Sequence, residues 1–186
     1  QCGMGRSGKL FAFEYADIVP YVILISKAIV GSQQLSIVVY NKELDKWTPG
    51  AHAGTFRGNQ LAMAAGTIVL ERVSDPAFLA EVARKGSIIR TRLEALKDEV
   101  SIIGDVRGKG LMLGVEFINH NGPVDIMGHP MPSGVIAALI QKMCFVNKLI
   151  MEKGGRDGSV MRCLCALNVR DDEIEFMLDV FERVVR

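Results

Sequence analysis

The sequence predicts an α/β region over residues 1–75, followed by an α+β lobe over residues 76–186. Two short apolar runs, residues 21–26 and 35–40, are joined by a short link and followed by a helical pattern. Ser74-Asp75-Pro76 then interrupts the chain. Beyond this point, helical stretches alternate with short strand-like runs, which indicates a second lobe of mixed structure.

In the first region, residues 21–26 form a continuous apolar run that ends at Lys27, which fits a strand buried on both faces. Residues 35–40 form a second, β-branched run. We expect both strands to be part of a parallel sheet. Residues 59–73 contain good helix formers, with apolar side chains on one face, and are predicted to be a helix.

In the second region, Asp75 can cap a helix that has Pro76 at its first position and continues through residues 77–100. Strands are expected at 102–104 and 111–118, around a glycine turn at 107–110, and again at 149–152 and 160–164. Residues 120–132 form a loop between these strands, and residues 133–147 a further helix. The closing helix is predicted at 171–185, with two aspartates in its first turn.

Composition argues against several classes of function. The chain of 186 residues has 22 Lys+Arg and 21 Asp+Glu, without a basic block that could follow a phosphate backbone, so no nucleic-acid partner is expected. The longest apolar run is interrupted by Pro20, so no membrane span is expected. The chain opens like mid-protein sequence, without a leader. Four cysteines in a chain of this length indicate reduced thiols in a cytoplasmic protein.

Two glycine-rich segments suggest loops that could approach a ligand. Residues 3–8 match G-x-G-x-x-G, but a dinucleotide site needs a strand before this pattern and a helix after it, so a simple turn is favoured. Residues 50–59 offer backbone N–H groups just before a helix, where proteins hold phosphate. A plain glycine loop is the alternative.

Two basic residues stand in apolar surroundings. Lys27 follows an apolar strand, and an amine shielded from solvent would be a nucleophile for an aldehyde. The alternative is a lysine that extends from the strand end to water, and position alone favours it. Arg162 lies in the run 160–164, where its guanidinium needs an anion. An internal salt bridge and a substrate carboxylate are equally plausible.

Metal chemistry is not expected. His52, His120 and His129 show no ligand spacing. Cys163 and Cys165 are better explained as wall residues of one strand than as a metal or redox pair.

Together, these segments resemble the class III aminotransferases, which are fold-type I enzymes dependent on pyridoxal 5'-phosphate (PLP). Residues 1–9 look like the sequence that follows Asp-Glu-Val in that family, and Ser26-Lys27-Ala28-Ile29 is similar to its Schiff-base lysine segment. The resemblance implies that residues 1–75 are the C-terminal part of the PLP-binding large domain. Residues 76–186 would be the interdomain helix and the C-terminal small domain.

The resemblance also implies roles for individual residues. Lys27 would hold PLP as a Schiff base and act as general base and acid. Gln1 would hydrogen-bond the ring oxygen of the cofactor, and Gly54 and Thr55 would bind its phosphate across the interface of a homodimer. Arg162 would receive the α-carboxylate of an amino-acid substrate.

Within the class, residues 44–60 and 154–158 look most like the 2,4-diaminobutyrate:2-oxoglutarate 4-aminotransferases. That resemblance implies transfer of the 4-amino group of L-2,4-diaminobutyrate to 2-oxoglutarate, which gives aspartate 4-semialdehyde and glutamate. Aminotransferases for ornithine or 4-aminobutyrate are the alternative enzymes.

Some positions depart from the family pattern. The aspartate that pairs with the pyridine nitrogen would precede Gln1, and Gly-Gly-Gly-Leu-Pro-Leu is replaced by residues 30–35, Val-Gly-Ser-Gln-Gln-Leu. Cys165-Ala166-Leu167 replaces Pro-Pro-Leu. These departures support a competing hypothesis, in which the chain is a non-catalytic fragment whose parallel sheet exposes unpaired edges.

Overall fold

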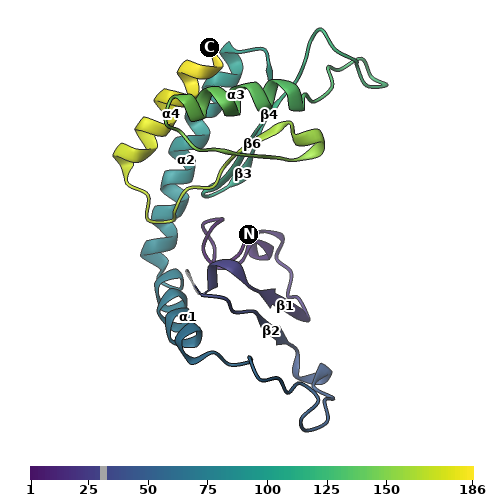
Figure 1. Ribbon diagram of the computed structural model, residues 1–186, viewed down its shortest axis with the longest axis vertical. Helices are drawn as coiled ribbons and strands as arrows, with labels where there is room; N and C mark the ends of the chain where they lie inside the picture. Colours follow the sequence, from purple (N-terminus) through teal and green to yellow (C-terminus); the bar gives the residue numbers. More distant parts are fainter. Residues whose placement is uncertain (30–32) are drawn as a thin grey trace. The chain divides into compact units, whose positions relative to one another are not determined.

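The computed structural model describes residues 1–29 and 33–186 (Figure 1). The chain divides into two compact units, Gln1–Ala80 and Glu81–Arg186. The division falls inside helix α2 (Pro76–Glu99), close to the predicted domain boundary near residue 75, which stays a prediction. Of the segment that departs from the family after the lysine, Val30, Gly31 and Ser32 lie outside the described residues.

The first unit contains a two-stranded sheet. β1 (Val22–Ile25) and β2 (Ile37–Tyr40) confirm the two predicted strands, and Val22 pairs with Tyr40. The strands are antiparallel, so the expected parallel sheet is wrong for this pair. The link of residues 26–36 explains the difference, because a parallel crossover needs roughly a dozen or more residues, usually with a helix.

The expected burial of β1 on both faces is also wrong for this chain. Leu24 is 76% exposed and Val22 46% exposed. A strand is enclosed on both faces only when it lies between two layers. The described residues of the first unit contain one α-helix that lies wholly within it, α1 (Gln60–Val73), which does not cover both faces.

Helix α1 matches the predicted helix at 59–73. It begins where the side chain of Asn59 accepts hydrogen bonds from the backbone N–H groups of Leu61 and Ala62, at 3.0 and 3.2 Å. Such a cap satisfies donors that the first helical turn leaves unpaired. Gly66 lets α1 lie against the backbone of Ile29, since a Cβ there would be 3.3 Å from the Ile29 carbonyl oxygen.

The glycine-rich opening of the chain forms turns, as expected. Gly8 donates to the carbonyl oxygen of Gly5 at 2.9 Å, and the first element to follow is the short 3-10 helix η1 (Ala12–Ala16). A dinucleotide site requires a long helix directly after this loop, and the described residues 9–21 contain only η1.

The second unit is a four-stranded antiparallel sheet with helices, in the strand order β3-β4-β6-β5 (Figure 1). Its elements are β3 (Ile103–Lys109), β4 (Met112–Phe117), α3 (Gly134–Val146), β5 (Glu152–Gly154), β6 (Val160–Cys163) and α4 (Asp171–Val185). Asp75 caps α2 as predicted, accepting from the Ala77 backbone N–H at 2.9 Å. The buried side chains of this unit come from all three helices and from the sheet, and Phe117 meets Phe181 with ring centroids 6.4 Å apart.

Two strand predictions need correction. β3 continues to Lys109, so the expected glycine turn at 107–110 belongs largely to the strand, and the chain reverses at Gly110 and Leu111. Gly108 has φ 138°, and a Cβ there would be 2.0 Å from the Met112 carbonyl oxygen. This glycine therefore permits close strand approach instead of ending the strand. β5 lies at Glu152–Gly154, later than the predicted 149–152.

None of the helices in the described part of the chain is both long enough and apolar enough to cross a membrane.

Candidate active site

A cavity of about 340 Å³ in the first unit brings two of the predicted cofactor residues together. Gln1 and Lys27 both line it, although they are far apart in the sequence. Apolar groups from residues 11–13 and from β1 form much of the remaining wall. A cavity with an amine, an amide and apolar walls has the general character of a small-molecule site.

The corner after β1 positions Lys27. Lys27 opens the short helix η2 (Lys27–Ile29) with a φ of 55°, a value that non-glycine residues seldom adopt. The preceding residue holds the corner, because the Ser26 hydroxyl donates to the Leu35 carbonyl oxygen at 3.3 Å and accepts from Ser36 at 3.0 Å. Backbone strain of this kind costs about 1 kcal/mol or more and is often found at functional sites.

Lys27 is exposed, so the expectation of a position shielded from solvent is wrong for this chain. The reason is the same as for β1: in the described residues, no second layer covers this side of the strand. The position at the end of an apolar strand was predicted correctly, but its burial was not.

Gly54 and Thr55 lie in the loop between η3 (Lys42–Leu44) and α1. The Arg57 N–H donates to the Gly54 carbonyl oxygen at 3.1 Å and closes a turn, at which Thr55 is exposed and Phe56 is 98% exposed. Neither Gly54 nor Thr55 is among the described residues that line the Lys27 cavity. This chain therefore does not bring the predicted phosphate loop to its own lysine.

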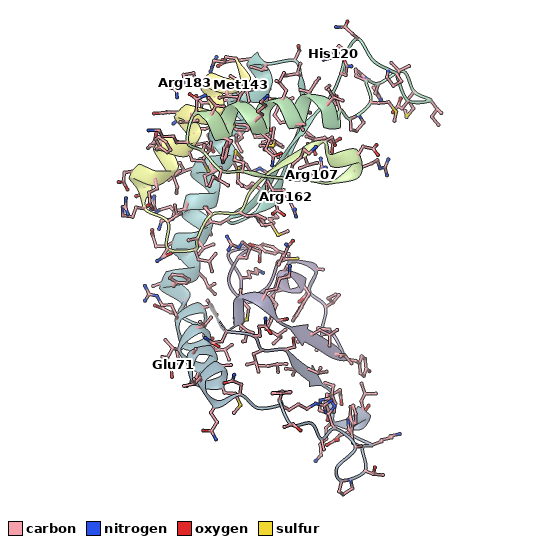
Figure 2. The ribbon with its side chains drawn as sticks, in the orientation of Figure 1. Glu71, Arg107, His120, Met143, Arg162 and Arg183 are labelled. Carbon is pink, nitrogen blue, oxygen red and sulfur yellow. The ribbon has the colours of Figure 1, made fainter. Side chains whose placement is uncertain are left out.

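Arg162 is on β6 (Figure 2). It lines a separate cavity of about 350 Å³ in the second unit. Its guanidinium forms an ion pair with Glu152 on β5, with 2.7 Å between Nη2 and Oε1. The internal salt bridge is therefore present. The Arg162 side chain is 26% exposed and less enclosed than its apolar run suggests, because β6 has only the short strand β5 beside it at that edge.

Glu152 does not satisfy every nitrogen of the Arg162 guanidinium. Its Nε is buried and has no hydrogen-bond partner among the described residues. The guanidinium also lies against Gly154, where a Cβ would come within 3.0 Å of it. A planar guanidinium is suited to receive a carboxylate. Glu152 was missed by sequence reasoning, because only the strand register pairs it with Arg162.

The cysteines behave as packing residues. Cys163 is fully enclosed on β6, and burial, with smaller contributions from Cys165 and Cys144, raises the pKa of its thiol to about 12. Burial also raises the pKa of the Cys144 thiol to about 11. Cys2, Cys144 and Cys163 are free thiols, and the described residues contain no group of three or more potential metal ligands.

Comparison with known proteins decides the family. The family model described as aminotransferase class-III matches residues 1–185. The chain belongs to the class III aminotransferases. This family depends on PLP, and the cavity that holds both Lys27 and Gln1 fits that cofactor, since an amine nucleophile and an amide donor lie in one apolar-walled space.

Similar curated proteins include two diaminobutyrate–2-oxoglutarate aminotransferases. The one from Rhizobium meliloti (strain 1021) is 46% identical over the whole of this chain, and the one from Haemophilus influenzae is 43% identical. The chain spans about 40% of the length of these relatives.

Solved structures confirm the fold-type I architecture. Acetylornithine aminotransferase from Elizabethkingia anophelis is 27% identical with a TM-score of 0.83, and the match covers 100% of this chain and 43% of that one. N-acetylornithine aminotransferase from Stenotrophomonas maltophilia is 25% identical with a TM-score of 0.80, covering 100% and 44%.

Proposed function

We propose that the protein uses PLP to transfer the 4-amino group of L-2,4-diaminobutyrate to 2-oxoglutarate, which gives aspartate 4-semialdehyde and glutamate. The observation that carries this proposal is the identity of 46% and 43%, over the whole chain, to two relatives named for diaminobutyrate and 2-oxoglutarate. The cavity lined by both Lys27 and Gln1 also supports the proposal, because it brings together two residues that are expected to bind PLP.

Lys27 is the proposed catalytic residue. Its amine is the group that would hold PLP covalently. Once the incoming amine has released it, the Lys27 amine would take a proton from the substrate carbon and deliver it to the carbon of the cofactor's aldehyde group. Bound PLP supplies an electrophilic carbon and an electron-withdrawing ring. Gln1, which lines the same cavity, would donate a hydrogen bond to the cofactor's ring oxygen.

Gly54 and Thr55 are proposed to bind the phosphate of a cofactor held by the other subunit of a homodimer. Their exposure, and their absence from the described lining of the Lys27 cavity, support action in trans. Backbone N–H groups near the start of α1 and the Thr55 hydroxyl are suitable phosphate donors.

Arg162 is proposed to receive the α-carboxylate of the substrate. Its planar guanidinium can form two parallel hydrogen bonds to a carboxylate, which a lysine cannot imitate. Glu152 pairs with Nη2 of the guanidinium, so substrate binding would compete with that ion pair.

A second candidate is transfer from N-acetylornithine or a related ω-amine. It is favoured by 32% identity over the whole chain to acetylornithine aminotransferase from Caldanaerobacter subterraneus. The lower identity makes this the weaker candidate. A cytoplasmic location is also proposed, because Cys2, Cys144 and Cys163 are free thiols.

The test is an assay of glutamate formation from 2-oxoglutarate, using the protein in the form its gene encodes and PLP. L-2,4-diaminobutyrate, ornithine, 4-aminobutyrate and N-acetylornithine are compared as donors. We expect kcat/KM for diaminobutyrate to exceed that of the others by about tenfold or more, the scale at which pocket contacts discriminate similar substrates. A higher value for N-acetylornithine would replace the proposed donor. Absence of glutamate with every donor would support the non-catalytic fragment.

A further inference from the structure

Strand β5 carries Glu152 and Gly154 on the face of the sheet that holds the Arg162 side chain. In the register of β5 and β6, Glu152 is directly opposite Arg162, and Gly154 is directly opposite Val160. Residues two positions apart on a strand project to the same face. A long side chain can reach its diagonal neighbour on the adjacent strand, so Arg162 lies against Gly154 as well as beside Glu152.

The Arg162 guanidinium lies with one of its faces over Gly154. A Cβ at Gly154 would be 3.0 Å from each of three Arg162 atoms, Cζ, Nε and Nη2. These atoms belong to one planar group, in which Cζ is bonded to both nitrogens. A point equally far from all three, at a distance much longer than those bonds, must lie above the plane. The space that a side chain of residue 154 would occupy is therefore filled by the guanidinium face.

The backbone of Gly154 does not itself require a glycine. Its φ lies outside the left-handed region, whereas the next residue, Gly155, has φ 75°. The absence of a Cβ provides space instead, because 3.0 Å is closer than an ordinary contact between non-bonded heavy atoms. The atoms that a Cβ would meet are the far end of a flexible side chain, so the guanidinium would move and the strand would not.

We infer that Gly154 is a positioning residue for the substrate carboxylate and acts through Arg162. The inference rests on the proposed role of Arg162 as the carboxylate receptor. Gly154 is not among the described residues that line the Arg162 cavity, so it supports the guanidinium without forming part of the cavity wall. One face lies on the strand and Nη2 is paired with Glu152, so little conformational freedom remains to be lost when a carboxylate binds.

Gly154→Ala should displace the guanidinium and weaken binding of the keto acid. We expect KM for 2-oxoglutarate to rise about fivefold or more, with a smaller change in kcat, because a displaced guanidinium makes poorer charge-assisted hydrogen bonds. Gly122→Ala is the matched control. Its Cβ would also meet a flexible polar side chain, at 2.9 Å from Asn119 Nδ2, and Gly122 does not line the Arg162 cavity. This variant should leave KM unchanged.

Two comparisons show whether the effect passes through Arg162. Glu152→Gln and Gly154→Ala both disturb the ion pair of Arg162, but they should shift KM for 2-oxoglutarate in opposite directions, because only Gly154→Ala also displaces the guanidinium. In an Arg162→Lys background, Gly154→Ala should change KM by less than about twofold. A lysine has no planar group that could rest on the strand.

Chemical modification measures the position of Arg162 without using activity. The protein in the form its gene encodes is treated with phenylglyoxal, which reacts with accessible guanidinium groups, and peptide mass mapping follows Arg162. The Arg162 side chain is 26% exposed and its Nε is buried, so modification should be slow, and it should be faster in Gly154→Ala. Arg170, which is 66% exposed, is the internal standard, and its rate should be the same in both proteins.

Failure of the inference and failure of the proposed function give different results. A wild-type protein that forms no glutamate would overturn the proposed function, and with it the role of Gly154. If the wild-type protein forms glutamate and Gly154→Ala keeps both its KM and its rate of Arg162 modification, only the inference is overturned. An equal rise of KM in the Arg162→Lys background, or a fall in kcat together with a lower free energy of unfolding in urea, would make the role of Gly154 merely structural.

Discussion

Glu152 and Arg162 pair across neighbouring strands, with 2.7 Å between Oε1 and Nη2, so the proposed carboxylate receptor already holds a carboxylate. Glu152 is 57% exposed, and a pair of this kind contributes at most about 1 kcal/mol. An incoming substrate can therefore displace it at moderate cost. Glu152 would tune the affinity of the site without taking part in the reaction.

Removing this competitor should strengthen binding of the keto acid. We expect Glu152→Gln to lower KM for 2-oxoglutarate by about two- to fivefold without changing kcat, because the lost ion pair opposed binding only. Steady-state kinetics measure this. Glu173→Gln is the control, since Glu173 lines the same cavity but pairs with Arg170. If the KM for 2-oxoglutarate does not change in Glu152→Gln, the proposal that Arg162 binds the substrate carboxylate is wrong.

Arg92 joins α2 to α4 through three acidic residues. It contacts Glu175 at 2.8 Å, Asp179 at 3.0 Å and Glu182 at 2.8 Å, and its side chain is 29% exposed. We expect Arg92→Ala to lower the free energy of unfolding by about 1–2 kcal/mol, more than an isolated surface pair would. Urea denaturation tests this. Arg170→Ala removes an arginine that is 66% exposed, so it should lower the free energy of unfolding much less than Arg92→Ala does. Equal losses in the two variants would contradict a special role for the Arg92 network.

Gly86 is where α2 meets the β3–β4 turn. A Cβ at this position would lie 2.3 Å from the Gly110 carbonyl oxygen, so a backbone would have to move. Glycine to alanine in an open helix usually stabilises by about 0.5–1 kcal/mol. We expect Gly86→Ala to destabilise by about 2 kcal/mol or more, in a thermal melt. The exposed neighbour Ser87→Ala serves as control, and a stabilised Gly86→Ala would contradict the close packing.

The buried thiols predict a dependence of stability on pH. Burial raises the pKa of Cys144 to about 11 and of Cys163 to about 12, from an ordinary value of 9.0. Below pH 9 both thiols are neutral in the folded and unfolded chain. As pH rises from 9 towards 11–12, only the unfolded chain ionises, so the free energy of unfolding falls.

Alkylation gives a second measurement of the same property. Iodoacetamide at pH 7.5 should modify Cys2, which is exposed, and should spare Cys144 and Cys163 until denaturant is added. Peptide mass mapping identifies the modified residues. Fast modification of Cys163 in the native protein would contradict its enclosure.

The sequence predicted the bounds of helices more reliably than the pairing and burial of strands. Helices α1, α2, α3 and α4 were predicted close to their bounds because their signals, such as the Asp75 cap of α2 and the apolar face of α1, are local. The antiparallel pairing of β1 with β2 was not predicted, and neither was their exposure. An apolar run shows that a strand prefers burial, but what covers the strand depends on other parts of the chain.

In the candidate site, too, local features were predicted from the sequence, whereas contacts between distant residues were not. Lys27 was found from its place after an apolar strand and from the family resemblance, and the structure adds that Gln1 shares its cavity. Position alone favoured a lysine that extends to water, and Lys27 is indeed exposed, whereas the resemblance led to the expectation of a shielded amine. The pairing of Arg162 with Glu152 depends on strand register, which residues ten positions apart do not reveal by themselves.

The most direct test of the central claim is to locate PLP on the chain. The protein is incubated with PLP, reduced with borohydride, digested and mapped by mass spectrometry, with Lys27→Ala as the variant and Lys9→Ala as a control in the same unit. The account predicts that the PLP mass is found on the peptide containing Lys27, that a visible absorbance band accompanies it, and that both disappear only in Lys27→Ala. PLP scattered over surface lysines, or a band that survives Lys27→Ala, would contradict it.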